Sequence, residues 1–182
     1  RSSDEYVGVS KAFPPSTGWT KEQFAFRFFI SRLSALHQSI AREIRHSNPH
    51  AVFPLMRVYF ETLCVLMYCT EHQDYIAALT AEFDAKNPQL KMDVILSRLS
   101  PISASLKAIY HDLSRVSHPQ ADAVSSVFPP ARKLANGQYF QNWWSIPHWR
   151  SEEDFKGVCG GMVEMVDTAF LYLNIFGQKY LE

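Results

Sequence analysis

The sequence predicts an all-α protein, in which about four long helices form an antiparallel bundle together with shorter helices. Two observations predict this class. Apolar residues recur at alternating spacings of three and four, which is the period of a helix with one buried face. Prolines and capping residues then divide the chain into separate helical stretches. With 182 residues, 47% of them hydrophobic, the chain can bury a sizeable core. We expect one domain over residues 1–182.

The first predicted helix follows an extended arm over residues 1–18, which contains Phe13-Pro14-Pro15 and no helical period. Thr20 has the form of an N-cap. One face of the helix carries apolar residues and one histidine: Phe26, Ile30, Leu33, His37, Ile40 and Ile44. We expect His37 to be a core histidine with one hydrogen bond. Ser47-Asn48-Pro49 is expected to end this helix.

A second helix is predicted from about residue 51 to residue 69. It is apolar almost all round, which is typical of a helix surrounded by other helices. Its length approaches that of a membrane span. Arg57 and Glu61 near its middle would cost about 2.5 to 3.5 kcal/mol each in a bilayer, so we expect a buried central helix and no membrane partner.

Three further helices are predicted in the middle of the chain. Residues 71–86 form an amphipathic stretch and residues 90–99 a short one. Ser100-Pro101 has the form of an N-cap followed by proline at the first helical position. Apolar residues then continue at helical spacing over 102–116. His118-Pro119 ends that helix because the residue before a proline is disfavoured in the α region.

Residues 119–150 differ from the rest because they have no helical period and are rich in aromatic residues. Asn136-Gly137 is a hairpin turn signal. We expect an aromatic-rich lid or loop before the last helix, irregular or folded as a small β-ribbon. Long irregular segments in compact domains are often functional, so Trp143 and Trp144 are candidate binding residues.

The last helix is predicted over residues 151–177. Ser151 precedes three acidic residues, which is typical of a helix start, and a glycine is typical of a helix end. Gly157, Gly160 and Gly161 lie inside this helix. Because a helical glycine costs about 1 kcal/mol relative to alanine, we expect close packing of a neighbouring helix or a ligand there.

Charge and cysteine content exclude some classes of protein. The 18 basic and 18 acidic residues cancel, which excludes a wholly basic nucleic-acid binder. The charge is segregated, however, because residues 21–50 and residues 98–133 each carry five basic and two acidic residues. The three cysteines, Cys64, Cys69 and Cys159, have no disulfide or metal-ligand pattern. Free thiols predict a cytoplasmic location.

Arg57 and Glu61 are the first candidate binding residues. They are four residues apart and therefore share a helix face. Residues 51–69 offer few other polar groups, so we expect the pair to be largely buried. One interpretation is a structural ion pair that sets helix register. The other is a functional pair, in which Arg57 binds an anionic group and Glu61 orients it or acts as a base.

A second group of candidates lies on residues 107–118. Lys107, His111, Arg115 and His118 form one stripe of a helix, which faces away from the main core, and Ser114 lies in the same segment. A solvated basic face is one interpretation. The other is a patch that binds phosphate or RNA. Because the helix must break at Pro119, the His118 side chain could turn inward toward Glu61 or Arg57.

The two segments together carry a resemblance to a known family. Arg57-x3-Glu61 and Leu113-Ser114-x3-His118-Pro119 resemble uncharacterised bacterial all-helical proteins related to the HEPN domains, the higher-eukaryote and prokaryote nucleotide-binding bundles, over about residues 20–120. The resemblance implies a homodimer that binds RNA or nucleotide. It also implies a metal-independent ribonuclease with Arg115 and His118 as catalytic residues. Only two residues separate these two, fewer than in the family's motif.

Three functions remain open from the sequence. The favoured one is a non-enzymatic binding or regulatory module, because no strong catalytic motif is present. The second is a HEPN-like metal-independent ribonuclease or RNA-binding protein. The third is a metal-dependent hydrolase on a bundle scaffold, although no H-x3-H or H-E-x-x-H spacing occurs. We expect no metal and no cofactor.

Overall fold

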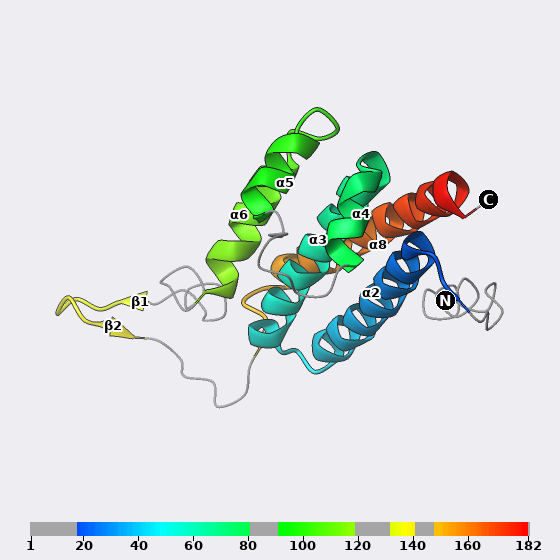
Figure 1. The fold of residues 1–182 in the computed structure, drawn as a ribbon. Coiled ribbons are helices and arrows are strands. Elements are labelled where there is room, and N and C mark those ends of the chain that lie inside the picture. The colour runs from blue at the N-terminus through cyan, green and yellow to red at the C-terminus, as the bar shows by residue number, and fades with distance from the viewer. Residues whose placement is uncertain (1–17, 81–90, 119–131, 141–147, 182) are drawn as a thin grey trace.

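A computed structural model describes residues 18–80, 91–118, 132–140 and 148–181. These residues form six helices and one pair of two-residue strands, which confirms the all-α class (Figure 1). The predicted arm, apart from residue 18, and Trp143 and Trp144 lie outside the described residues.

Helix α2 (Lys21–Arg45) begins at the predicted N-cap. The Thr20 hydroxyl accepts a hydrogen bond from the Gln23 backbone N–H at 3.2 Å, and the Gln23 side chain accepts one from the Thr20 N–H at 3.1 Å. This reciprocal capping box satisfies two N–H groups that a helix start leaves open. At the other end, Ser47 has a positive φ of 52°, and the Asn48 N–H reaches back to the carbonyl of Glu43 at 3.0 Å. Ser47 therefore occupies a left-handed position that usually belongs to glycine.

Helix α3 (Pro49–Glu71) is the central helix, as predicted, because it packs against α2, α4, α5, α6 and α8. It begins at Pro49, two residues before the predicted start, because proline fits the first turn of a helix. Length and composition alone would allow α3 and α8 to cross a membrane. Most of the apolar stretch of α3 is instead buried inside the protein.

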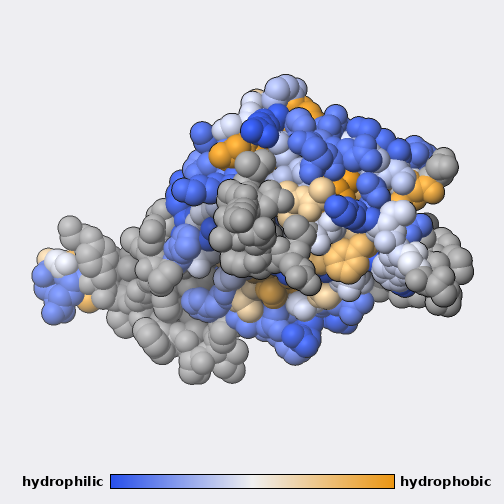
Figure 2. Space-filling view, viewed as in Figure 1, coloured by the Kyte–Doolittle hydropathy of each residue, from blue (hydrophilic) through white to orange (hydrophobic). Residues whose placement is uncertain are grey.

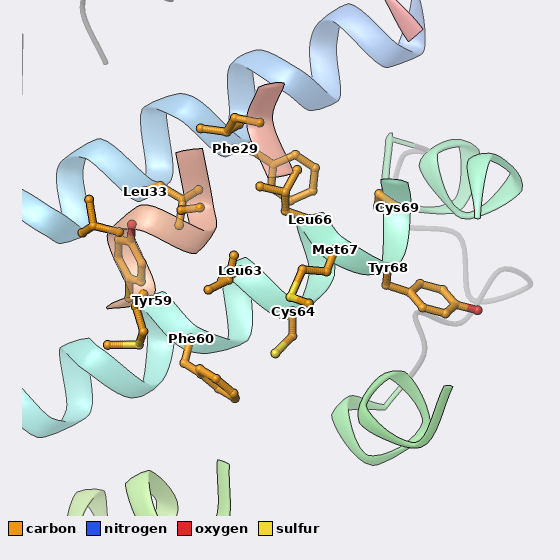
Figure 3. Packing of buried hydrophobic residues seen from close by; sticks show 14 of the residues in the cluster. Phe29, Leu33, Tyr59, Phe60, Leu63, Cys64, Leu66, Met67, Tyr68 and Cys69 are labelled. Carbon is orange, nitrogen blue, oxygen red and sulfur yellow. The ribbon is translucent and has the colours of Figure 1, made fainter. Parts of the chain in front are cut away.

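The core lies between α2, α3 and α8. Figure 3 shows Phe29 and Leu33 of α2 pointing toward α3, where Tyr59, Leu63 and Leu66 are buried. Phe176 of α8 contacts the ring of Phe29 at a centroid distance of 6.2 Å. Each such side chain stabilises the fold by about 1.5 to 3 kcal/mol when removed from water.

Helices α4 (Gln73–Thr80), α5 (Met92–Leu99) and α6 (Leu106–Ser117) follow α3. The predicted start of α6 at Ser100-Pro101 is wrong. Ser100 instead ends α5, because the N–H groups of Ile102 and Ser103 bond back to the Leu99 carbonyl in a turn that closes that helix. Turns then lead to the true start at Leu106, so Ile102 lies outside the helix and is 45% exposed.

Helix α8 (Glu152–Tyr180) begins at Ser151, whose hydroxyl accepts a hydrogen bond from the Asp154 N–H at 3.0 Å. The helix continues past Gly177, where we had expected its end, because the Leu181 N–H still bonds to the Gly177 carbonyl. The expected close packing at Gly157, Gly160 and Gly161 is also wrong for the described residues. A Cβ added at any of the three would meet open space.

The last turn of α8 closes the end of α3. Lys179 Nζ donates a hydrogen bond to the Thr70 carbonyl at 2.6 Å, and the Tyr180 hydroxyl donates to the same carbonyl at 2.9 Å. Tyr180 also lies 3.3 Å from the Cys69 carbonyl. These carbonyls belong to the group that a helix end leaves without an intrahelical partner.

Strands β1 (Arg132–Lys133) and β2 (Tyr139–Phe140) pair antiparallel, with Arg132 opposite Phe140. Gly137 in the connecting turn has a φ of 81°, which glycine adopts without strain. Residues 119–131 and 141–147 of the predicted aromatic insertion lie outside the described residues, so the insertion as a whole stays a prediction.

Candidate functional site at the α3–α6 interface

The candidate site lies where α6 packs against α3. Tyr110, Ser114 and His118 are four residues apart along and just beyond α6, so they follow one line of the helix surface. Arg57 and Glu61 occupy successive turns of α3. Arg57 contacts both Tyr110 and His118, so this line faces the arginine.

The Arg57 guanidinium is the centre of the cluster. Its Nε donates a hydrogen bond to Glu61 Oε1 at 3.0 Å. One terminal nitrogen, Nη1, lies 2.7 Å from His118 Nε2, and the other, Nη2, donates to the Tyr110 hydroxyl at 3.3 Å. The guanidinium carbon also lies 5.5 Å from the centre of the Tyr110 ring. One side chain therefore joins two helices through three polar partners.

The ion pair is less buried than the sequence suggested. The Arg57 side chain is 22% exposed and the Glu61 side chain 29% exposed. Partial burial opposes the charged form of Arg57. The hydrogen bond to Tyr110 and the negative charge of Glu61 outweigh this effect and raise the pKa of Arg57. The Arg57 guanidinium is therefore a fixed positive charge that solvent can reach, and the Glu61 carboxylate beside it balances that charge.

His118 turns toward Arg57, which is one of the two orientations expected from the helix break at Pro119. Its backbone is extended, with φ −88° and ψ 148°, and α6 ends one residue before it. A guanidinium can only donate hydrogen bonds. The 2.7 Å contact therefore requires Nε2 to accept, with the ring proton on Nδ1. Because His118 is exposed, a ligand can reach this imidazole.

Ser114 lies between Tyr110 and His118 on the same line. Its hydroxyl oxygen is buried and has no hydrogen-bond partner within the described ranges. A buried polar atom without a partner costs about 1 to 3 kcal/mol. The arrangement therefore includes one unsatisfied hydroxyl beside two side chains that bind Arg57.

The other predicted site residues of α6 lie on its solvent side. Lys107, His111 and Arg115 are exposed, as the stripe predicts. Arg115 forms an exposed ion pair with Asp112 at 3.5 Å. Arg57, on α3, contacts His118 through a guanidinium nitrogen. The structure thus brings together residues of the two segments that we had treated as separate groups.

No group of three or more His, Cys, Asp or Glu side chains suited to a metal ion occurs in the part of the chain that the structure describes.

Sequence reasoning missed Tyr110, which completes the Arg57 cluster. Its spacing of eight residues from His118 was the available signal, because that spacing places both on one side of α6.

Sequence reasoning also missed a hollow of about 540 Å³ between α3, the start of α6 and α8, where Phe60, Ile109 and Met165 are among the lining residues. Ile109, one of the apolar residues at helical spacing over 102–116, is 40% exposed. Figure 2 shows that hydrophobic residues reach the surface at several separate places between hydrophilic ones.

The comparisons with known proteins add no relative. No family model matches this chain. No curated protein and no solved structure matches it either. The resemblance to HEPN-related proteins therefore stays a prediction.

Proposed function

We propose that this protein is a helical binding module for RNA, which it holds through a phosphate at the Arg57 cluster. One observation carries the proposal. Three nitrogens of a half-buried guanidinium each have a polar partner, and a guanidinium has five N–H donors. Two N–H donors, one on each terminal nitrogen, therefore have no hydrogen-bond partner among the described residues. Two such donors suit the oxygens of one phosphate.

The exposed stripe of α6 supports RNA over a small free anion. Lys107, His111 and Arg115 lie on the same helix as His118 and face solvent. Basic side chains spaced along a helix can contact successive phosphates of a chain, and each contact adds to the salt dependence of binding. The zero net charge of the protein is compatible with this, because the positive charge is local.

A second candidate function is metal-independent cleavage of RNA, and the contact between Arg57 and His118 favours it. When a phosphate takes over the guanidinium, His118 Nε2 is released and can accept the proton of a ribose 2′-hydroxyl. The 2′-oxygen then bonds to phosphorus while the bond from phosphorus to the 5′-oxygen breaks. His118 returns the proton to that oxygen, and Arg57 stabilises the negative charge on the phosphate. The products are a 2′,3′-cyclic phosphate and a 5′-hydroxyl.

Binding of a fluorescent RNA in EDTA at low salt tests both functions. We expect Arg57→Gln to weaken binding about tenfold or more, whereas Lys156→Gln on exposed α8 is the matched control and leaves binding unchanged. Cleavage with cyclic-phosphate ends that His118→Ala abolishes would establish the second function. Binding without cleavage supports the module alone. No binding at low salt would overturn both.

The finer architecture belongs to the same proposal. We propose that the long helices form one antiparallel bundle with an aromatic β-ribbon insertion before α8, and that two copies form a homodimer in the cytoplasm. The close connection of α2 to α3 through one turn supports antiparallel neighbours. Light scattering of the purified chain tests the dimer, and a monomeric mass at micromolar concentration would contradict it.

A further inference from the structure

The exposed side of α2 carries an unusual set of aromatic residues. Trp19, just before α2, is 40% exposed, and Phe24 and Phe28 of α2 are 54% and 41% exposed. Large apolar side chains are usually buried in the core. The opposite side of α2 already packs into the core through Phe29 and Leu33. The exposed rings are therefore additional to those that hold the helix in place.

Two arginines accompany these rings. The guanidinium carbon of Arg27 lies 4.1 Å from the centre of the Trp19 ring, and that of Arg32 lies 6.0 Å from the centre of the Phe28 ring. Both distances fall within the range of a cation–π contact. Arg32 Nε also donates a hydrogen bond to the Thr62 hydroxyl of α3 at 3.1 Å, which fixes its position.

The rings and arginines line a hollow of about 910 Å³ along α2. Its other lining residues are small, apolar or uncharged, and Ser31 and Gln38 are among them; no acidic residue lines the hollow in the described part of the chain. A second hollow of about 490 Å³ continues along the helix and is lined by Arg45 and by Arg42, which forms an ion pair with Glu43 at 3.3 Å. The surface is therefore aromatic at one end of α2 and basic along its length.

We propose that this surface of α2 binds single-stranded RNA, with bases stacked on the exposed rings and phosphates held by the arginines. Stacking rings interleaved with basic groups are the combination that single-stranded nucleic acids require. The choice of RNA rests on the proposed function, but the surface is separate from the Arg57 cluster.

A second copy of this chain fits the surface less well. In a two-fold dimer the same surface of each copy faces the other, so the basic groups of both surfaces would be brought close together. Arg27 and Arg32 have no acidic residue beside them in the lining of the first hollow, so such a dimer would concentrate positive charge without neutralising it, which is unfavourable. A polyanion neutralises the same arginines, and this complementarity selects RNA as the occupant.

The experiment measures binding of fluorescent twelve-nucleotide oligo(U) to the full chain by anisotropy at low salt. Phe24→Ala and Arg27→Gln each lower affinity about fivefold or more. Leu171→Ala removes an equally exposed apolar side chain of α8 and serves as the matched control, with no change expected. Circular dichroism establishes that the variants are folded.

The outcomes separate this proposal from the proposed function. If Arg57→Gln weakens binding and the α2 variants do not, the α2 surface is refuted while the Arg57 site stands. If the α2 variants weaken binding and Arg57→Gln does not, the Arg57 site is refuted while the α2 surface stands. Absence of RNA binding overturns both. The α2 proposal also falls if Phe24→Ala leaves RNA binding intact but abolishes dimerisation or binding to vesicles of anionic phospholipid.

Discussion

Replacing Arg57 by methionine tests how strongly the cluster joins α3 to α6. Methionine keeps most of the side-chain volume but makes none of the three polar contacts. The contact with Glu61 is a partly exposed pair within one helix, which contributes about 0.5 kcal/mol. The contacts with His118 and Tyr110 link two elements and contribute about 1 kcal/mol each. We therefore expect Arg57→Met to lower the free energy of unfolding by about 2.5 kcal/mol.

Urea unfolding followed by circular dichroism measures this loss. With a slope of about 2 kcal/mol per molar urea, the midpoint falls by about 1 M. Arg115→Met is the matched control, because Arg115 is an exposed arginine of α6 and its ion pair with Asp112 is also exposed. We expect Arg115→Met to change the free energy of unfolding by no more than about 0.5 kcal/mol.

A double-mutant cycle identifies the contact responsible. Combining Arg57→Met with Tyr110→Phe gives a coupling energy of about 0.5 to 1 kcal/mol if the two side chains interact as the structure shows. A coupling of zero would refute the interaction. An equal loss in Arg57→Met and Arg115→Met would refute the linking role of the cluster as a whole.

Three other predictions concern the helix end, the thiols and a histidine. Ser47→Gly relieves the left-handed backbone at φ 52° and raises the free energy of unfolding by about 1 kcal/mol in urea titrations; a loss would contradict the strain. Burial raises the pKa of Cys64 and of Cys69 to about 12, so a thiol reagent at pH 8 modifies partly exposed Cys159 first and the other two only on unfolding. Burial lowers the pKa of His37, so the unfolded chain binds the proton more readily and stability falls as pH drops below about 6.5. His37→Gln makes stability less dependent on pH in that range, and an unchanged dependence would refute the assignment.

The fold class could be predicted because helix formation leaves local marks. Thr20 and Ser151 are N-caps whose side chains accept hydrogen bonds from the first turn of their helices. The spacing of Phe26, Ile30 and Leu33 indicates which face of the helix is buried. Ser100 was misread because a serine before proline suits both the end of one helix and the start of the next. The structure assigns Ser100 to the end of α5 because the next backbone hydrogen bonds return to Leu99.

The candidate site could be predicted only in pieces. Arg57 and His118 were both singled out, yet their contact joins residues 61 positions apart. Such a contact depends on how α6 docks on α3, and helix spacing within one segment carries no information about the rotation of another. The same limit explains the three glycines of α8, whose sequence pattern is the same whether a neighbouring helix covers them or solvent does.

The closure of α3 by the end of α8 has a consequence for synthesis of the chain. The Thr70 carbonyl receives its hydrogen bond from Lys179, which is translated 109 residues later. The central helix therefore leaves the ribosome with its last turn open to water, and its completion waits for translation of the residues up to Lys179. A nascent chain stalled before Lys179 would expose the end of α3 to chaperones and proteases.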